Sequence, residues 1–317
     1  MAHKSQPVRK GFTQAVETSG CAGIVRKSGP MSASPSHAGA TDAPTDDELV
    51  RAARDGDGAA LETLLVRYQP HLYRFGLRMC GNTEDASDVA QESLMSMARA
   101  VRDFRGDSSV SSWLYTIARR FCLKKRRRSK FAPAAEESLD AATGPGLADR
   151  LADPAPGPER IAANRELARA LLDAIDALDP PQREVLVLRD VEGLSAPDVA
   201  SVLGVSVDAV KSRLHRARVA VRQTLAPILD GPARTAPPST PACPDVPALF
   251  SRYLEGEIAP DACAAMETHL AHCPHCRGAC DSLKRVLATC RRLPTPDVPA
   301  SLSSSIKTAI EAFLAQH

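Results

Sequence analysis

Two stretches of low sequence complexity divide the chain, and they limit what it can fold into more than any other feature. Residues 132–158 and 230–242 are rich in Ala and Pro and offer few large apolar side chains. Such compositions are typical of linkers. Residues 1–44 are rich in Ser, Gly, Ala and Pro, and we expect them to form a disordered extension. The sequence therefore predicts three folded units, at 45–131, 159–229 and 243–317.

Apolar residues recur at helical spacing in these units. Leu61, Leu64 and Leu65 begin one such run, and similar runs follow further along the chain. Residues that can cap a helix stand before the runs: Thr45 or Asp46 before the first, and Asn82 or Thr83 before the next. The alternation expected of strands is missing from the sequence pattern. The predicted fold class is therefore all-α.

The segment Gly193–Arg222 has the pattern of a helix-turn-helix. Ser195 can cap a first helix, Gly204 supplies the turn, and Ser206 can cap a second helix. The second helix of such a motif presents its first turns to base edges in the major groove. DNA binding is the prediction, and a helical hairpin with a solvated basic face is the alternative. The outer face of the second helix would carry Lys211, Ser212, Arg213, His215 and Arg216, and Arg218 and Arg222 would continue the positive run.

A metal-binding pattern, H-x3-C-x2-C, spans His269, Cys273 and Cys276. On a helix, His269 and Cys273 lie one turn apart on the same face, and Cys276 follows across a tight turn. Zinc in structural sites takes four nitrogen or sulfur ligands, and we expect Cys243 to be the fourth. The predicted cofactor is thus Zn²⁺. A zinc with four protein ligands has no open position for catalysis, so we do not expect an enzyme.

Further His and Cys residues near this pattern leave three alternatives open. They are inert, or their thiols form a disulfide after an oxidant displaces the zinc, or they bind another soft metal. The residues are His272, His275, Cys263, Cys280 and Cys290.

The hydropathy pattern predicts a cytoplasmic protein with no membrane contact. No apolar run reaches the roughly 18 residues that a membrane-spanning helix needs. The first residues include Lys and Arg but have no apolar segment behind them, so a secretory signal is not expected.

Two blocks of sequence resemble the extracytoplasmic-function sigma factors of the sigma-70 family. LDPPQREVLVLRDVEGLS (178–195) and the helix-turn-helix after it resemble region four. DASDVAQESLMSMAR (85–99) and FRGDSSVSSWLYTIARRFCLKKRRR (104–128) resemble region two. The blocks stand in the family's order and are joined by a linker, as in the family.

The resemblance implies a transcription initiation factor that binds core RNA polymerase and promoter DNA. The polymerase-binding residues would be Asp85, Asp88, Gln91 and Glu92, of which the three acidic ones form a stripe on one helix face. The residues for the minus-ten element would lie on the polar face of a helix at 108–125 and would be Tyr115, Arg119, Arg120 and Lys124. The residues for the minus-thirty-five element would be Ser206, Asp208, Lys211, Ser212, Arg213 and Arg216.

The stretch from Cys243 to Cys276, with its YLEGE segment at 253–257, resembles a zinc-binding anti-sigma domain. In that family the domain grips a sigma factor and hides its binding faces. The resemblance therefore implies an intramolecular contact between the C-terminal unit and the two sigma regions, with the apolar stripe at 306–314 as a docking helix. The rival interpretation is a helix-turn-helix regulator that acts without joining the polymerase, which leaves the acidic stripe and the 104–128 block unexplained.

Overall fold

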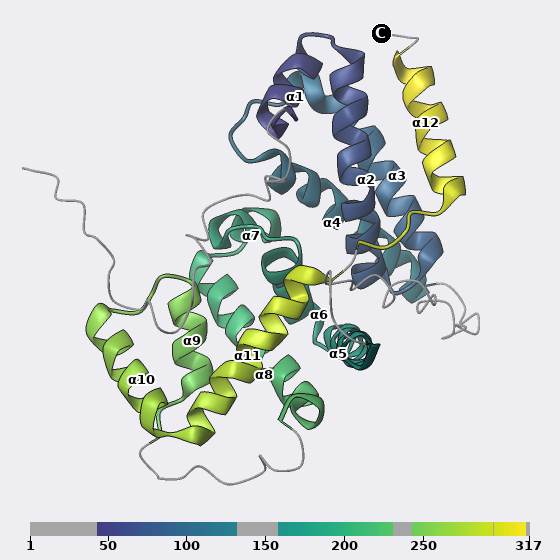
Figure 1. The fold of residues 1–317 in the computed structure, drawn as a ribbon. Coiled ribbons are helices and arrows are strands. Elements are labelled where there is room, and N and C mark those ends of the chain that lie inside the picture. The colour runs from purple at the N-terminus through teal and green to yellow at the C-terminus, as the bar shows by residue number, and fades with distance from the viewer. Residues whose placement is uncertain (1–42, 132–157, 231–242, 294, 315–317) are drawn as a thin grey trace, which may run out of the picture.

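The structure is a computed structural model (Figure 1). In the parts of the chain that it describes, helices are the only regular secondary structure. Those parts are residues 43–131, 158–230, 243–293 and 295–314. The all-α prediction is confirmed. The predicted N-terminal extension and the two predicted linkers lie outside the described residues, except for one or two positions at their ends. No helix in the described ranges is long and apolar enough to cross a membrane.

The first unit contains α1 (Asp46–Arg54), α2 (Gly58–Cys80), α3 (Thr83–Ala100), a short 3-10 turn (Val101–Asp103) and α4 (Val110–Phe131). Thr45 caps α1 in a capping box with Glu48, and the side chain of Asn82 caps α3, as predicted. Gly76 lets α2 and α3 approach closely, because a Cβ there would lie 2.9 Å from the Cα of Ala86.

The second unit contains α5 (Pro158–Asp176), α6 (Pro180–Leu186), a π-helical turn (Val187–Val191), α7 (Ala196–Leu203) and α8 (Val207–Asp230). Helices α7 and α8 are the predicted helix-turn-helix. The Ser195 hydroxyl accepts a hydrogen bond from the backbone N–H of Asp198, and Ser206 accepts one from Ala209. Gly204 ends α7 with a φ of 67°, the left-handed conformation that glycine adopts most easily. The predicted caps and turn are confirmed.

The third unit contains α9 (Val246–Leu254), α10 (Pro260–His272), α11 (Pro274–Arg292) and α12 (Ala300–Leu314). Helices α9 to α11 share a small core of their own, which includes Val246, Phe250 and Met266. Helix α12 separates from them and packs on α3 of the first unit, where it buries Ile306 and Ile310 (Figure 1).

The three units pack against one another. Helix α4 contacts α7, α11 contacts α8 and α5, and α12 contacts α3 (Figure 1). One continuous apolar core joins the first two units and takes in Val286, Leu302 and Ile306 of the third. The linker compositions predicted separate units but gave no information about these interfaces, because helical periodicity shows which face is buried and not what buries it.

Candidate metal centre and binding faces

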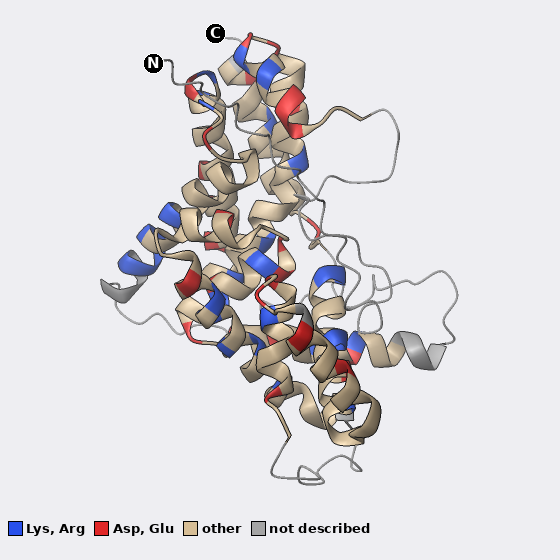
Figure 2. Cartoon of the chain, turned by 90° about the vertical axis from the view of Figure 1, so that its left-hand side faces the viewer, with Lys and Arg blue, Asp and Glu red and all other residues tan. Residues whose placement is uncertain are grey.

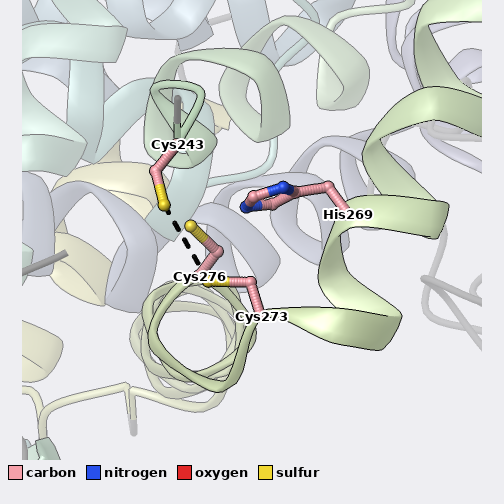
Figure 3. Close-up of side chains that lie close together, drawn as sticks. All are labelled: Cys243, His269, Cys273 and Cys276. Atoms are coloured by element: carbon pink, nitrogen blue, oxygen red, sulfur yellow. Dashed lines mark hydrogen bonds between the residues drawn. The ribbon is translucent and has the colours of Figure 1, made fainter. Parts of the chain in front are cut away.

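The four predicted metal ligands come together. One ligand atom from each of Cys243, His269, Cys273 and Cys276 lies within 4.8 Å of the others (Figure 3). His269 lies near the end of α10, Cys273 stands between α10 and α11, and Cys276 lies in the first turn of α11. Cys243 reaches the cluster from the segment before α9, and its Sγ lies 3.9 Å from that of Cys273.

The geometry and chemistry of the cluster fit a metal ion. Sulfur ligands at 2.3 Å around a tetrahedral zinc lie about 3.8 Å apart, close to the observed separation. Among the described residues, Nε2 of His269 is buried without a hydrogen-bond partner, as expected of a nitrogen that serves as a metal ligand. Burial, with hydrogen bonds to Cys273 and Cys243, raises the pKa of Cys276 to about 12. A bound cation would reverse this balance, because it stabilises thiolates.

The five additional His and Cys residues all lie outside this cluster. Cys263 and Cys280 are buried in the small core, and Cys290 is buried against the second unit. Burial raises the pKa of Cys280 and of Cys290. His272 hydrogen-bonds the carbonyl of Thr268, and His275 is exposed.

The predicted polymerase-binding face lies on α3. Lys125 of α4 pairs with Asp85 at 3.2 Å and also with Asp88. The side-chain oxygen of Gln91 accepts a hydrogen bond from Ser305 of α12 at 3.5 Å, and Glu92 is exposed. Other parts of the same chain thus contact Asp85, Asp88 and Gln91, while the Asp88 side chain remains 48% exposed.

The predicted minus-ten residues on α4 divide into two pairs. Arg120 and Lys124 are exposed. Tyr115 was expected on the polar face, but it is only 2% exposed and its hydroxyl donates to Glu192 at 2.7 Å. Arg119 pairs with Glu184 of α6 at 3.2 Å. The expected exposure of Tyr115 is wrong for this conformation, because the second unit packs over that side of α4.

The predicted minus-thirty-five residues on α8 are mostly accessible. Ser206, Asp208, Ser212 and Arg216 are exposed, Arg213 is partly buried, and Lys211 pairs with Glu257 at 2.6 Å. The two basic residues that continue the positive run are covered. Arg218 is 1% exposed, and the guanidinium of Arg222 donates to Ser282 of α11 at 2.8 Å. Helices α9 and α11 of the third unit lie over this part of α8.

Glu192 joins the first two units and was not singled out by the sequence. Its side chain is fully buried and accepts hydrogen bonds from Arg74 at 2.6 and 2.7 Å and from Tyr115. Nδ1 of His71 lies 3.3 Å away. Burial alone would raise the pKa of Glu192, but the hydrogen bonds and charges of His71 and Arg74 outweigh it and lower the pKa to about 2. The partners lie more than 75 positions away in sequence, so no local pattern reveals them.

Glu255 joins the third unit to the second. Its carboxylate, 4% exposed, lies 3.2 Å from Nε of Arg189 and 3.1 Å from Nη2 of Arg218. Arg218 also makes a bidentate pair with Asp190, at 2.7 and 2.8 Å. Acidic and basic residues intermingle at the centre of the molecule, where the units meet (Figure 2). The only sequence signal for Glu255 was its place in the YLEGE segment.

Comparison with known proteins identifies the family. The family model "Sigma-70 region 2" matches residues 64–131, "Sigma-70, region 4" matches 168–221, and "Putative zinc-finger" matches 243–277. The RNA polymerase sigma-H factor of Pseudomonas aeruginosa is 32% identical over 58% of this chain and 95% of its own length. The ECF RNA polymerase sigma factor SigM of Mycobacterium tuberculosis is 35% identical over 57% of this chain and 85% of its own. The chain belongs to the ECF sigma factors.

In this ECF sigma factor, the family models place region 2 within α2 to α4 and region 4 within α5 to α8. The family makes it a transcription initiation factor of RNA polymerase, and the rival interpretation of a separate helix-turn-helix regulator is not favoured. Among solved structures, CnrH in complex with the cytosolic domain of CnrY aligns over 56% of this chain and 94% of that chain, with 29% identity and a TM-score of 0.39.

Proposed function

We propose that this sigma factor is autoinhibited, and that the structure represents its inactive state. In this state the third unit and the contacts between regions 2 and 4 occupy the faces that would bind core polymerase and promoter DNA. The observation that carries the proposal is the packing of α12 on α3, the helix with the predicted polymerase-binding stripe.

The α12 contact combines apolar and polar contacts. Ile306 and Ile310 are buried, which excludes water from the interface. Ser303 accepts a hydrogen bond from Gln69 of α2 at 3.1 Å, and Ser305 donates to Gln91 of α3. A polymerase surface that docks on Gln91 would first have to displace α12.

The contact between regions 2 and 4 would block the reading of the minus-ten element. Tyr115 and Arg119 are held by Glu192 and Glu184 of the second unit. Ser112 adds a hydrogen bond to Asp198 at 2.9 Å. Because single-stranded DNA is held by stacking surfaces and basic groups, these side chains must separate from region 4 before they can bind it.

The third unit would limit the reading of the minus-thirty-five element. Glu257 pairs with Lys211 of α8, and Glu255 pairs with Arg218 of the same helix and with Arg189 of the π-helical turn. Acidic side chains thus occupy positions near which DNA phosphates would otherwise bind. The third unit would therefore compete with DNA at Lys211, while Ser206, Asp208, Ser212 and Arg216 stay exposed.

We also propose that the sigma factor acts in the compartment that holds the chromosome.

We further propose that the Cys243, His269, Cys273 and Cys276 cluster binds Zn²⁺ as a structural ion. Its ligands come from the segment before α9, from α10 and from α11, so the ion would fix these three parts together. Helix α11 packs on α8 and α5, and α9 carries Glu255 at its end. The metal would therefore stabilise the arrangement of α9 and α11, the two helices of the third unit that pack on region 4.

Promoter-specific transcription in vitro with purified core polymerase tests the proposed function. The full chain is compared with a chain that lacks residues 241–317, at equal concentrations. We expect low initiation from the full chain and a strong increase after the deletion. Equal activity of the two chains would refute autoinhibition, whereas inactivity of both, with the truncated chain folded by circular dichroism, would refute the proposed holoenzyme.

A further inference from the structure

Two cysteines outside the metal cluster lie in contact inside region 2. Cys80 is the last residue of α2, and Cys122 lies in the middle of α4. Their sulfur atoms are 3.3 Å apart, at hydrogen-bonding distance for thiols, and both are free thiols. Cys122 is buried, whereas Cys80 is partly exposed. The sigma-factor function proposed above uses neither residue.

The surroundings of the pair make the two thiols unequal. The hydrogen bond between the sulfurs lowers the pKa of Cys80, and the nearby charges of Lys125 and Arg126 act in the same direction against burial and Asp85. The same hydrogen bond and burial raise the pKa of Cys122. Reactive cysteines combine thiolate character with access to solvent, and peroxide-sensitive ones often stand next to a second thiol. Cys80 is partly exposed and has a lowered pKa, and Cys122 lies beside it as the second thiol.

We propose that Cys80 and Cys122 form an oxidation site in region 2, at which hydrogen peroxide produces a reversible disulfide between α2 and α4. In the first step the Cys80 sulfur attacks the peroxide. A sulfur–oxygen bond forms, the oxygen–oxygen bond breaks, and the departing hydroxide takes up the thiol proton as water. In the second step the Cys122 sulfur attacks the resulting sulfenic acid. The sulfur–sulfur bond forms, the sulfur–oxygen bond breaks, and hydroxide leaves with the Cys122 proton as a second water.

These two steps balance. The two thiols lose two electrons and two protons, and one peroxide is reduced to two waters. The sulfur atoms must approach from 3.3 Å to about 2.05 Å. Cys80 can make this movement because it is the last residue of its helix and is followed by Gly81 in the left-handed conformation, with a φ of 82°.

The disulfide would connect α2 to the helix that carries the predicted minus-ten residues. Cys122 lies between Arg120 and Lys124 on α4, the two predicted residues that are exposed. The modification would therefore fix the part of α4 closest to the proposed DNA contacts, whether or not the third unit is docked.

Peptide mapping of the full-length protein tests the inference. The reduced protein is treated with one to several equivalents of hydrogen peroxide, the remaining thiols are alkylated, and the digest is analysed by mass spectrometry without reduction. We expect a linked peptide pair that contains Cys80 and Cys122, lacks two hydrogens, and disappears after treatment with dithiothreitol. Cys80 that stays reduced while other cysteines are oxidised, or that is linked mainly to a different cysteine, would overturn the proposal.

Variants separate the two steps. In Cys122→Ser the reaction should stop at the sulfenic acid of Cys80, which dimedone traps. In Cys80→Ser the buried Cys122 should stay reduced. Cys290→Ser is the matched control, because it removes another buried thiol and should leave the linked peptide at the wild-type level. If a variant does not fold, the mapping of the wild-type protein still decides the outcome.

Discussion

Replacement of Glu255 by Gln should open the autoinhibited sigma factor. The substitution keeps the size of the side chain and removes the charge that faces Arg189 and Arg218, both almost fully buried. Removal of one partner from a buried ion pair costs about 3–5 kcal/mol. Arg218 keeps its bidentate pair with Asp190, so we expect the lower end, about 3 kcal/mol. Because each 1.4 kcal/mol is a factor of ten, the ratio of closed to open molecules should fall about 100-fold.

Glu257→Gln is the matched control for this substitution. It makes the same chemical change two residues away, but the Glu257 carboxylate is 32% exposed and pairs with Lys211 near the surface. Exposed ion pairs contribute about 0–1 kcal/mol, so the control should change the ratio by about fivefold at most.

The assay for both variants is initiation by core polymerase at limiting sigma factor. The apparent affinity of a protein for its partner scales with the fraction in the competent state, so Glu255→Gln should need much less protein for half-maximal initiation. Hydrogen exchange in α9 should also increase, because its contact with α8 is weakened. If Glu255→Gln and Glu257→Gln behave alike in both measurements, the role assigned to the buried charge is refuted.

Three further predictions follow from other parts of the structure. His269→Ala should release most of the bound zinc, measured by metal analysis after dialysis, while His272→Ala, outside the cluster, should retain it. Glu192 has its pKa lowered from 4.5 to about 2, so its contribution to stability is complete above about pH 4.5 and is lost as the pH falls toward 2. Glu192→Gln should therefore lower the free energy of unfolding in urea near neutral pH and flatten its decline in acid, and a parallel decline would contradict the assignment. Arg216→Ala in the truncated chain should weaken promoter binding by about 1–3 kcal/mol in fluorescence anisotropy, and unchanged affinity would remove Arg216 from the proposed DNA contacts.

The sequence predicted those features of the fold that depend on neighbouring residues. Thr45, Ser195 and Ser206 were expected to cap helices because their hydroxyls can bond backbone N–H groups two or three positions later, and all three do. The metal cluster was predicted almost as directly. His269 lies in the last turn of α10, Cys273 follows directly after that helix, and Cys276 lies in the first turn of α11, so only Cys243 had to arrive from a distance.

The resemblance predicted that the stripe at 306–314 would dock on a sigma region, and α12 does pack on α3. The pairs of residues that meet at the interfaces could not be predicted, because the partners are distant in sequence. Arg218 continues a basic run that looks solvated, but it is buried, because Asp190 of its own unit and Glu255 of the third unit both pair with it. Tyr115 stands on a face that is polar by composition, yet Glu192 covers it. A periodic pattern identifies a helix face but not its neighbour, so both residues were assigned to the surface.

The equilibrium affinity for core polymerase tests the central claim most directly. The full chain and the chain without residues 241–317 can be compared by titration of a fluorescent label placed in either protein, with no DNA present. If the third unit covers the face of α3 that binds polymerase, the truncated chain should bind at least about tenfold more tightly. Equal affinities would show that α12 and its neighbours do not cover the polymerase-binding face, and would contradict the account.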